Sequence, residues 1–85
     1  MRQSRRSQPA LGKAIRQLRT KREMTQETLS EQADITTRAL SQIETGNANP
    51  TWATVRDLAA ALGVTMAELA RLAERHEGSA SPSEK

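Results

Sequence analysis

Apolar residues recur at helical spacing along most of the chain, and they predict a series of helices between residues 9 and 76. The first helix, at about 9–22, carries apolar residues at positions i, i+4 and i+7, namely Leu11, Ile15 and Leu18. Pro9 fits the start of this helix, because proline is tolerated in a first helical turn. The pattern therefore predicts a helix at the beginning of the folded part.

Two short helices follow. Thr25 is a candidate N-cap residue, and Leu29 and Ala33 repeat at i+4 behind it, which indicates a second helix at about 26–33. A third helix begins at the capping candidates Thr36 and Thr37. We expect it to stop at Gly46, since glycine commonly ends a helix in a left-handed conformation.

Two more helices complete the folded part. A fourth helix is predicted at about 50–62, with Asn49 as its N-cap residue and Pro50 as its first helical residue. Its apolar series is Val55, Leu58, Ala59 and Leu62. The run from Thr65 to Glu68 matches a capping box and opens a fifth helix, which turns Leu69, Leu72 and Ala73 inward. With five helices and no strand pattern, the sequence predicts an all-α fold.

The second and third helices are joined by only about three residues, Asp34 and Ile35 among them. That length is enough for a sharp corner and is typical of a helix-turn-helix. On a helical wheel, Ala39, Leu40 and Ile43 of the third helix face one way. The opposite face carries hydroxyls, one amide and one guanidinium, without a carboxylate at its centre: Thr37, Arg38, Ser41, Gln42 and Thr45.

This polar face suits contact with DNA. Base edges in the major groove offer acceptors on guanine, a donor and an acceptor on adenine and a methyl group on thymine, which Arg, Gln, Thr and Ser side chains can meet. Carboxylates on this face would be repelled by the flanking phosphates. The alternative is a polar, solvent-exposed face that happens to lack acidic residues.

Charge divides the chain into two ends. Residues 1–22 hold eight cations and no anion, whereas residues 23–85 hold five cations and ten anions. Residues 1–8 form a basic arm, and both this arm and residues 77–85 lack apolar periodicity, so we expect flexible tails on either side of a single domain at 9–76. A cationic end suits a polyanion such as nucleic acid or an anionic membrane surface, and a solubilising arm is the alternative.

Composition excludes several classes of function. The chain has 85 residues and no cysteine, so it has room for one small domain and has no disulfide framework or thiolate metal site. No apolar stretch approaches the roughly 18 residues of a membrane span. The basic N-terminus is also not followed by the apolar stretch of a signal peptide, so we expect a cytoplasmic location. The lone His76 has no Cys and no second His to form a metal site with it, so we expect no metal and no cofactor. A nucleophile needs an activating base in a pocket, and the single histidine falls outside the compact region, so we expect no enzymatic activity.

Three segments together resemble the Cro and phage-repressor type of helix-turn-helix protein, also called the XRE family. They are Met24 to Ser30 (MTQETLS), Leu40 to Gly46 (LSQIETG), and Pro50 with Leu58 to Val64 (LAAALGV). The match covers about 11–72, nearly the whole folded part. The resemblance implies a compact five-helix, lambda-repressor-like domain in which the second and third predicted helices form the helix-turn-helix.

The resemblance also implies roles for single residues. The residue that opens the second helix holds a DNA phosphate in such proteins, and here it is Gln26. The start of the third helix and the residue one turn later read bases, which corresponds to Thr36, Thr37, Arg38, Ser41 and Gln42. The loop after this helix approaches the DNA backbone, which makes phosphate contacts of Asn47, Asn49 and Thr51.

Roles for three further residues follow from the same resemblance. An arginine of the first helix pairs with the glutamate that ends the third, and Arg19 and Glu44 occupy these positions as a structural ion pair. The turn position usually filled by glycine is Asp34. We expect the turn to survive this departure, since Asp tolerates a left-handed backbone better than most residues.

Two residues invite a functional reading that the sequence does not favour. Trp52, the only aromatic residue, is expected to be a partly buried cap on the core, and a contact to phosphate or to a partner is the alternative. His76 is expected to be a surface residue favoured by the dipole at the C-terminus of the last helix.

The sequence thus predicts a DNA-binding transcriptional regulator, a repressor or an autoregulator, that inserts its third helix into the major groove of double-stranded operator DNA. A single module of this kind buries only about 600 to 1,000 Å² against DNA, so a homodimer on palindromic half-sites about one helical turn apart is expected. The fifth helix is a candidate dimer surface, although its apolar residues equally fit closure of the core: Met66, Leu69, Ala70, Leu72 and Ala73. The basic arm would add phosphate or minor-groove contacts through Arg2, Arg5 and Arg6.

The sequence does not separate several more specific functions. An antitoxin with a toxin partner and the controller of a restriction-modification system share this chemistry. A protein-interaction adaptor without sequence-specific DNA binding is the alternative from a different class.

Overall fold

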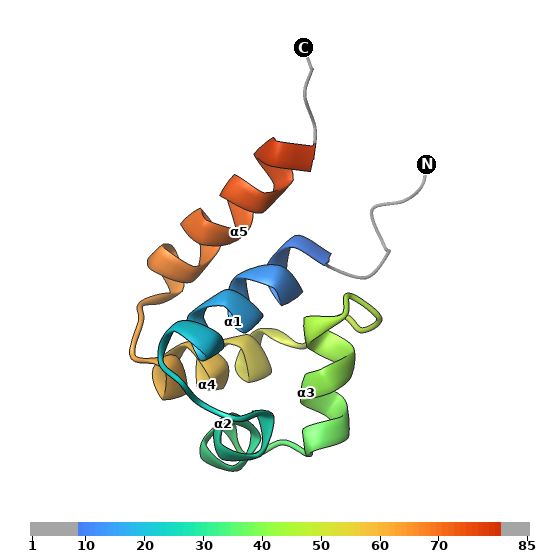
Figure 1. Cartoon of the computed structure of the whole chain (residues 1–85), viewed down its shortest axis with the longest axis vertical. Coiled ribbons are helices and arrows are strands. Elements are labelled where there is room, and N and C mark those ends of the chain that lie inside the picture. Colours follow the sequence, from blue (N-terminus) through green and yellow to red (C-terminus); the bar gives the residue numbers. More distant parts are fainter. Residues whose placement is uncertain (1–8, 81–85) are drawn as a thin grey trace.

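The computed structural model describes residues 9–80, and within them it contains five α-helices and no strand. The helices are α1 (Pro9–Lys21), α2 (Gln26–Ala33), α3 (Thr37–Glu44), α4 (Trp52–Leu62) and α5 (Met66–Ala80). Figure 1 shows α1 across the middle of the molecule, with α5 on one side of it and α2 and α3 on the other. The predicted all-α class is confirmed.

The predicted boundaries need small changes. α3 ends at Glu44, two residues before Gly46, although Gly46 does adopt the expected left-handed conformation, with a φ of 82°. α5 continues to Ala80 and so enters the predicted C-terminal tail. The three arginines of the predicted arm (Arg2, Arg5 and Arg6) and residues 81–85 lie outside the described residues. None of the helices formed by residues 9–80 is long and apolar enough to cross a membrane.

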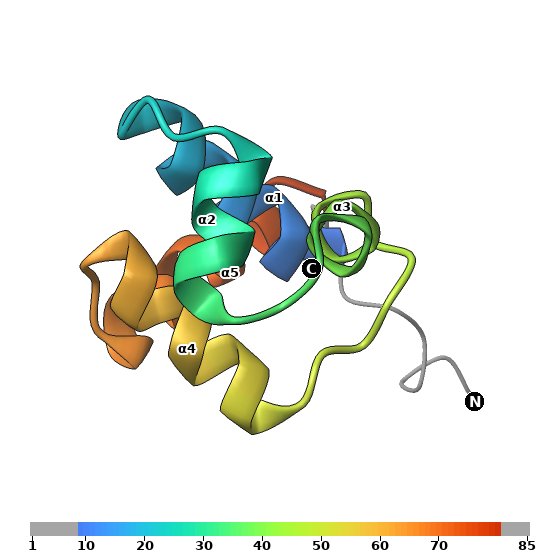
Figure 2. The same cartoon turned by 90° about the horizontal axis from the view of Figure 1, so that it is seen from below.

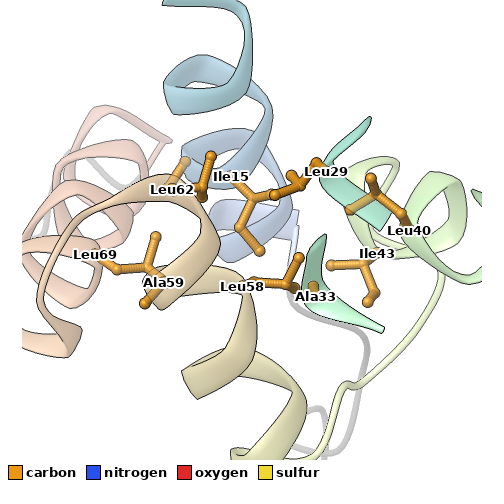
Figure 3. Packing of buried hydrophobic residues seen from close by; sticks show 10 residues of the cluster. Ile15, Leu29, Ala33, Leu40, Ile43, Leu58, Ala59, Leu62 and Leu69 are labelled. Carbon is orange, nitrogen blue, oxygen red and sulfur yellow. The ribbon is translucent and has the colours of Figure 1, made fainter. Parts of the chain in front are cut away.

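The core draws on every helix. The largest side chains that are fully buried are aliphatic, and they converge between the helices (Figure 3): Ile15, Leu29, Leu40, Leu58, Leu62 and Leu69. Burial of one such side chain contributes roughly 1.5 to 3 kcal/mol. Most of the other large apolar side chains of residues 9–80 are partly buried and pack against this cluster. A core of modest size therefore holds all five helices.

Threonine residues cap the N-termini of α2, α3, α4 and α5. Thr25, Thr36 and Thr51 each accept a hydrogen bond from the backbone N–H three residues later, over 2.9 to 3.1 Å. Thr65 and Glu68 form the predicted capping box, in which each side chain accepts from the other residue's backbone N–H. Thr25, Thr36 and Thr65 are capping residues as predicted.

The predicted start of α4 is wrong. Thr51, not Asn49, is its N-cap residue, and the helix begins at Trp52, so Pro50 precedes the helix. Asn-Pro and Thr-Trp are both acceptable beginnings in the local sequence. The Thr51 hydroxyl decides between them because it reaches the N–H of Thr54 at 3.1 Å.

Two backbone features position α3. Asp34 has the left-handed conformation expected of it, with φ 61° and ψ 45°, and it makes the corner between α2 and α3. Gly12 on α1 lies so close to the end of α3 that a β-carbon there would clash with the backbone oxygen of Ile43. The sequence assigned no role to Gly12. Only glycine allows α3 to lie this close to α1, and α3 is thereby held on one side of the molecule.

Candidate nucleic-acid interface

The outer face of α3 is built around two long polar side chains. Leu40 and Ile43 are buried on the inner face, as the helical wheel predicts. Arg38 and Gln42 are exposed and lie one turn apart on the outside. Neither side chain makes a hydrogen bond or an ion pair to another residue in 9–80, so both are available to groups beyond the surface.

The hydroxyls at the start of α3 have structural roles in this fold. Thr36 accepts from the N–H of Ala39 as the N-cap residue, over 2.9 Å. The Thr37 hydroxyl lies 3.2 Å from that of Ser30 on α2, which ties the two helices of the helix-turn-helix together. Ser41 is half-buried. Of the five side chains assigned to base reading, Arg38 and Gln42 are therefore the two that are both long and unoccupied.

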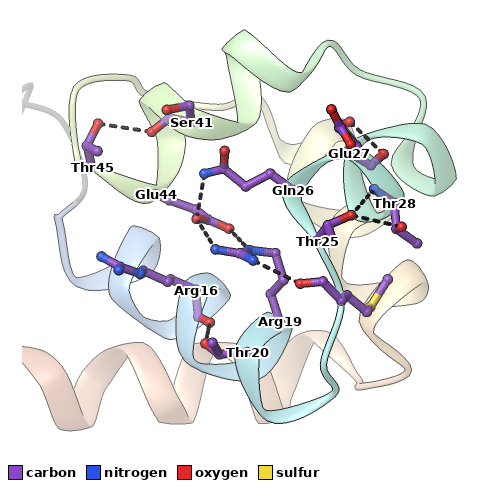
Figure 4. A network of polar contacts seen from close by, with 12 residues as sticks. Arg16, Arg19, Thr20, Thr25, Gln26, Glu27, Thr28, Ser41, Glu44 and Thr45 are labelled. Carbon is purple, nitrogen blue, oxygen red and sulfur yellow. Dashed lines mark hydrogen bonds and ion pairs between the residues drawn. The ribbon is translucent and has the colours of Figure 1, made fainter.

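Gln26 at the start of α2 faces the end of α3. Its side-chain amide donates a hydrogen bond of 3.0 Å to Glu44 (Figure 4), which the sequence did not predict. The Thr25 hydroxyl satisfies the N–H of Thr28. The N–H groups of the first helical residues have no partner inside a helix, so the first turn of α2 presents backbone donors beside the amide of Gln26.

An ion pair fixes this arrangement. Arg19 donates from Nε to Oε2 of Glu44 at 2.7 Å and from Nη2 to Oε1 at 3.1 Å. Its Nη1 also donates to the backbone oxygen of Met24, so α1, α3 and the segment before α2 meet at one guanidinium. The Glu44 side chain is only 2% exposed and that of Arg19 is 13% exposed. A buried carboxylate that accepts three hydrogen bonds thus joins the predicted phosphate contact to the end of α3.

The loop after α3 contains the other predicted phosphate contacts. Asn47 is exposed and donates from Nδ2 to the Thr45 hydroxyl at 3.2 Å, and Asn49 is exposed as well. The Thr51 hydroxyl bonds to the N–H and the hydroxyl of Thr54, so it is engaged at the start of α4. In Figure 2, this loop runs from the end of α3 to the start of α4.

The expectation for Trp52 is wrong. Its residue surface is 69% exposed, and it is the only exposed large hydrophobic residue in the part of the chain that the structure describes. As the first residue of α4, it projects from the helix end and does not cap the core. The spacing of apolar residues along α4 does not predict this exposure, because Trp52 lies at the very start of the helix, before the apolar residues that face the core.

His76 also differs from the expectation. α5 continues to Ala80, so His76 does not lie in the last turn, and the argument from the helix dipole does not apply to it. The ring is half-buried, and its Nε2 lies 2.9 Å from Oε1 of Gln17 on α1. His76 therefore joins α5 to α1.

The apolar residues of α5 mainly close the core. Leu69 is 1% exposed, and Met66, Leu72 and Ala73 are partly buried against the central cluster. Ala70 is exposed, but it is small. Of the two alternatives for these residues, core closure is the one that the packing favours.

Comparison with known proteins agrees with this geometry. Residues 10–72 match the model of a helix-turn-helix domain. The chain is similar to the clp gene regulator ClgR from Corynebacterium glutamicum, with 26% identity and a TM-score of 0.79, over 81% of this chain and 88% of that chain. It is also similar to the restriction-modification controller protein C.AhdI from Aeromonas hydrophila, with 30% identity and a TM-score of 0.70, over 72% of this chain and 92% of that chain.

A third solved structure shares the fold. It is the restriction-modification controller protein C.Esp1396I, with 20% identity and a TM-score of 0.74, over 80% of this chain and 90% of that chain. A search among curated protein sequences finds no match. The family match covers most of the chain and includes α2, the turn at Asp34 and α3. The chain therefore belongs to the helix-turn-helix domain family and has the five-helix fold of XRE-type regulators.

Proposed function

We propose that this protein is a transcription regulator that binds operator DNA by inserting α3 into the major groove. The observation that carries the proposal is the outer face of α3, where Arg38 and Gln42 are exposed, one turn apart and without a partner in residues 9–80. Two solved relatives support it, since ClgR is named as a gene regulator and C.AhdI as a controller protein. The proposed role is binding, with no catalysed reaction. Its proposed location is the cytoplasm, where operator DNA would be bound.

The two side chains would recognise different bases. Arg38 matches the O6 and N7 acceptors of guanine with its forked donors, and Gln42 matches the N6 and N7 groups of adenine. Thr37 and Ser41 flank them and would add hydroxyl contacts to bases, while Thr36 caps the start of the helix. Specificity therefore rests mainly on one guanidinium and one amide.

Phosphate contacts lie on either side of α3. On one side, Gln26 and the first N–H groups of α2 meet a phosphate, where the helix N-terminus favours an anion. On the other side, Asn47, Asn49 and Thr51 approach the backbone from the loop. These contacts fix the position of α3 in the groove and carry no sequence information themselves.

The bound form is proposed to be a homodimer on palindromic half-sites. A module of this size buries about 600 to 1,000 Å² against DNA, and a second copy is the usual way to reach high affinity. C.Esp1396I, which shares the fold, is a tetramer in the complex with its natural 35 base-pair operator. That controller protein and C.AhdI favour a second candidate for this chain, the control of a restriction-modification system.

Selection of bound sequences from a random DNA pool tests the proposal. The selection is run at about 150 mM salt, because the sequence-independent attraction of phosphates weakens as salt rises. We expect one enriched motif, and two inverted copies of it about one helical turn apart for a dimer. A folded, helical protein that enriches no motif would instead be a protein-interaction adaptor.

A further inference from the structure

A second polar surface lies on the other side of α1 from α3. The C-terminal end of α1, the part of α5 from Glu68 to Arg75 and the segment between α4 and α5 line an open groove of about 810 Å³, here called the α1–α5 groove. Figure 1 shows that α5 and α3 lie on opposite sides of α1. A side chain on α3 that faces DNA is therefore remote from this groove.

The rim of the α1–α5 groove is strongly cationic. Four exposed cations line it, namely Lys21, Arg22, Arg71 and Arg75. Among the lining residues, Glu68 is the only carboxylate. Glu68 accepts the N–H of Thr65 in the capping box at 2.8 Å. The one ion pair found among residues 9–80 joins Arg19 to Glu44, so none of the four rim cations has a carboxylate partner there. Like charges around one groove repel each other, and an anionic occupant would relieve this repulsion.

The floor of the groove is apolar. Leu18, Val64 and Leu72 line it, and each is half-buried against the core, so part of each side chain still faces the groove. Gly63 lies beneath Arg22, whose Nη1 would be 3.5 Å from a β-carbon at that glycine. Along α5 the lining runs from Glu68 to Arg75, which is about 10 Å of helix. The groove is therefore long, apolar at its base and cationic at its edges.

We infer that the α1–α5 groove binds an acidic, amphipathic segment of another protein. Apolar side chains of that segment would rest on Leu18, Val64 and Leu72, and its carboxylates would pair with the rim cations. A helix that lays its apolar face into a groove is a common mode of peptide recognition. Carboxylates can accept paired hydrogen bonds from arginine, which favours arginine on such a rim.

Two other occupants fit less well. A DNA backbone offers phosphates for the rim but no apolar groups for the floor. A second copy of this chain, related by a two-fold axis, would place the groove against itself, because such an interface uses the same patch on both subunits. The four cations of one copy would then face the same four of the other. The charge and the floor together select an acidic amphipathic partner.

The test uses labelled peptides of about 12 residues, a length that spans the groove as a helix. The first peptide has leucine at two positions four residues apart and Glu or Asp at most others. A second replaces both leucines with serine, and a third replaces the acids with Gln and Asn. Fluorescence anisotropy with the full chain at about 150 mM salt gives the affinities, because surface charges farther apart than about 8 Å are screened there. We expect the second and third peptides to bind at least about tenfold more weakly than the first.

Matched variants locate the binding. Arg71→Glu with Arg75→Glu should weaken the first peptide by at least about tenfold, whereas Lys13→Glu with Arg56→Glu makes the same change in net charge at exposed sites outside the groove and should change it by less than about threefold. Circular dichroism checks that each variant is folded. If the first pair fails to fold, Arg71→Gln with Arg75→Gln replaces it, with the same direction expected.

Three results would overturn the inference. The first is an equal loss in the groove and control variants, which would mean attraction by net charge alone. The second is full binding of the serine peptide, which would mean a site for anions without use of the floor. The third is displacement of the first peptide from the groove by a DNA duplex, which would make nucleic acid the occupant. A peptide that stays bound while the protein holds duplex DNA on α3 supports it.

Discussion

The outer face of α3 and the α1–α5 groove are both exposed and polar, but they are built from different chemistry. The α3 face offers one guanidinium, one amide and several hydroxyls on a convex helix, whereas the groove has four cations around a concave apolar floor. Amides and hydroxyls have donors and acceptors in fixed directions, so they can distinguish one base from another. Clustered cations attract any anion, and only the shape and the apolar floor of the groove can add selectivity. Net charge therefore does not identify the reading surface of this protein.

Loss of the ion pair should have the largest effect. Arg19→Ala leaves the buried carboxylate of Glu44 without its bidentate partner, and we expect the free energy of unfolding to fall by about 3 to 5 kcal/mol. Urea denaturation measures this change. The double variant Arg19→Leu with Glu44→Leu removes both charges and should be less destabilised than the single variant. An Arg19→Ala protein as stable as the parent would show that the pair does not hold α3 in place.

Base preference should depend on the two free side chains of α3. Arg38→Ala and Gln42→Ala should each cost about 1 to 3 kcal/mol on the best site and relax preference at one base position, with an unchanged fold. Repeating the DNA selection with each variant gives both quantities. Arg56→Ala on α4 is the matched control for the loss of an exposed arginine. Unchanged preference in both α3 variants would move the reading surface elsewhere.

Gln26→Ala should have a smaller and uniform effect. It removes a phosphate contact and also the 3.0 Å hydrogen bond to Glu44, so we expect binding to weaken by about 1 kcal/mol on every DNA sequence. Titrations with the best site and with a random duplex measure the two losses side by side. A loss confined to the best site would mean that Gln26 takes part in reading bases.

The groove should have the smallest effect on DNA. Arg71→Gln with Arg75→Gln should change affinity for the selected site by less than about 0.5 kcal/mol, because a surface change away from an interface is usually within that range. The slope of affinity against salt should also stay constant. A shallower slope, with equal loss on all sequences, would show that the groove contacts phosphates and would end the distinction between the two surfaces.

Much of the fold follows from local patterns. The spacing of leucines and the caps at Thr25, Thr36 and Thr65 identify the helices, since capping uses atoms only a few residues apart. The same logic fails at α4, where Asn49 and Thr51 are both good caps and only the folded loop selects Thr51. Local patterns also fail to predict the exposure of Trp52. That exposure depends on which helices pack around the residue, and the neighbouring residues in the sequence do not determine this packing.

The candidate site divides in the same way. The residue types on the outer face of α3 are visible in the sequence as a stripe without acid, and a resemblance to a family was enough to assign Arg19 to Glu44. The assignment of Gln26 to phosphate gave no sign of its hydrogen bond to Glu44, which spans 18 positions. Nor does the sequence separate Arg38 and Gln42 from Thr36 and Thr37, whose hydroxyls are engaged in the folded protein.

The sequence by itself determined the five helices, the sharp corner at Asp34 and the polar stripe of α3, because each depends on residues within a few turns of one another. The tertiary structure alone decided which polar side chains stay free and where the cations gather. Lys21 and Arg22 are about 50 positions from Arg71 and Arg75, and they meet only because α5 packs along α1. The close approach of α1 and α3 at Gly12 is likewise invisible until two distant backbones are brought together.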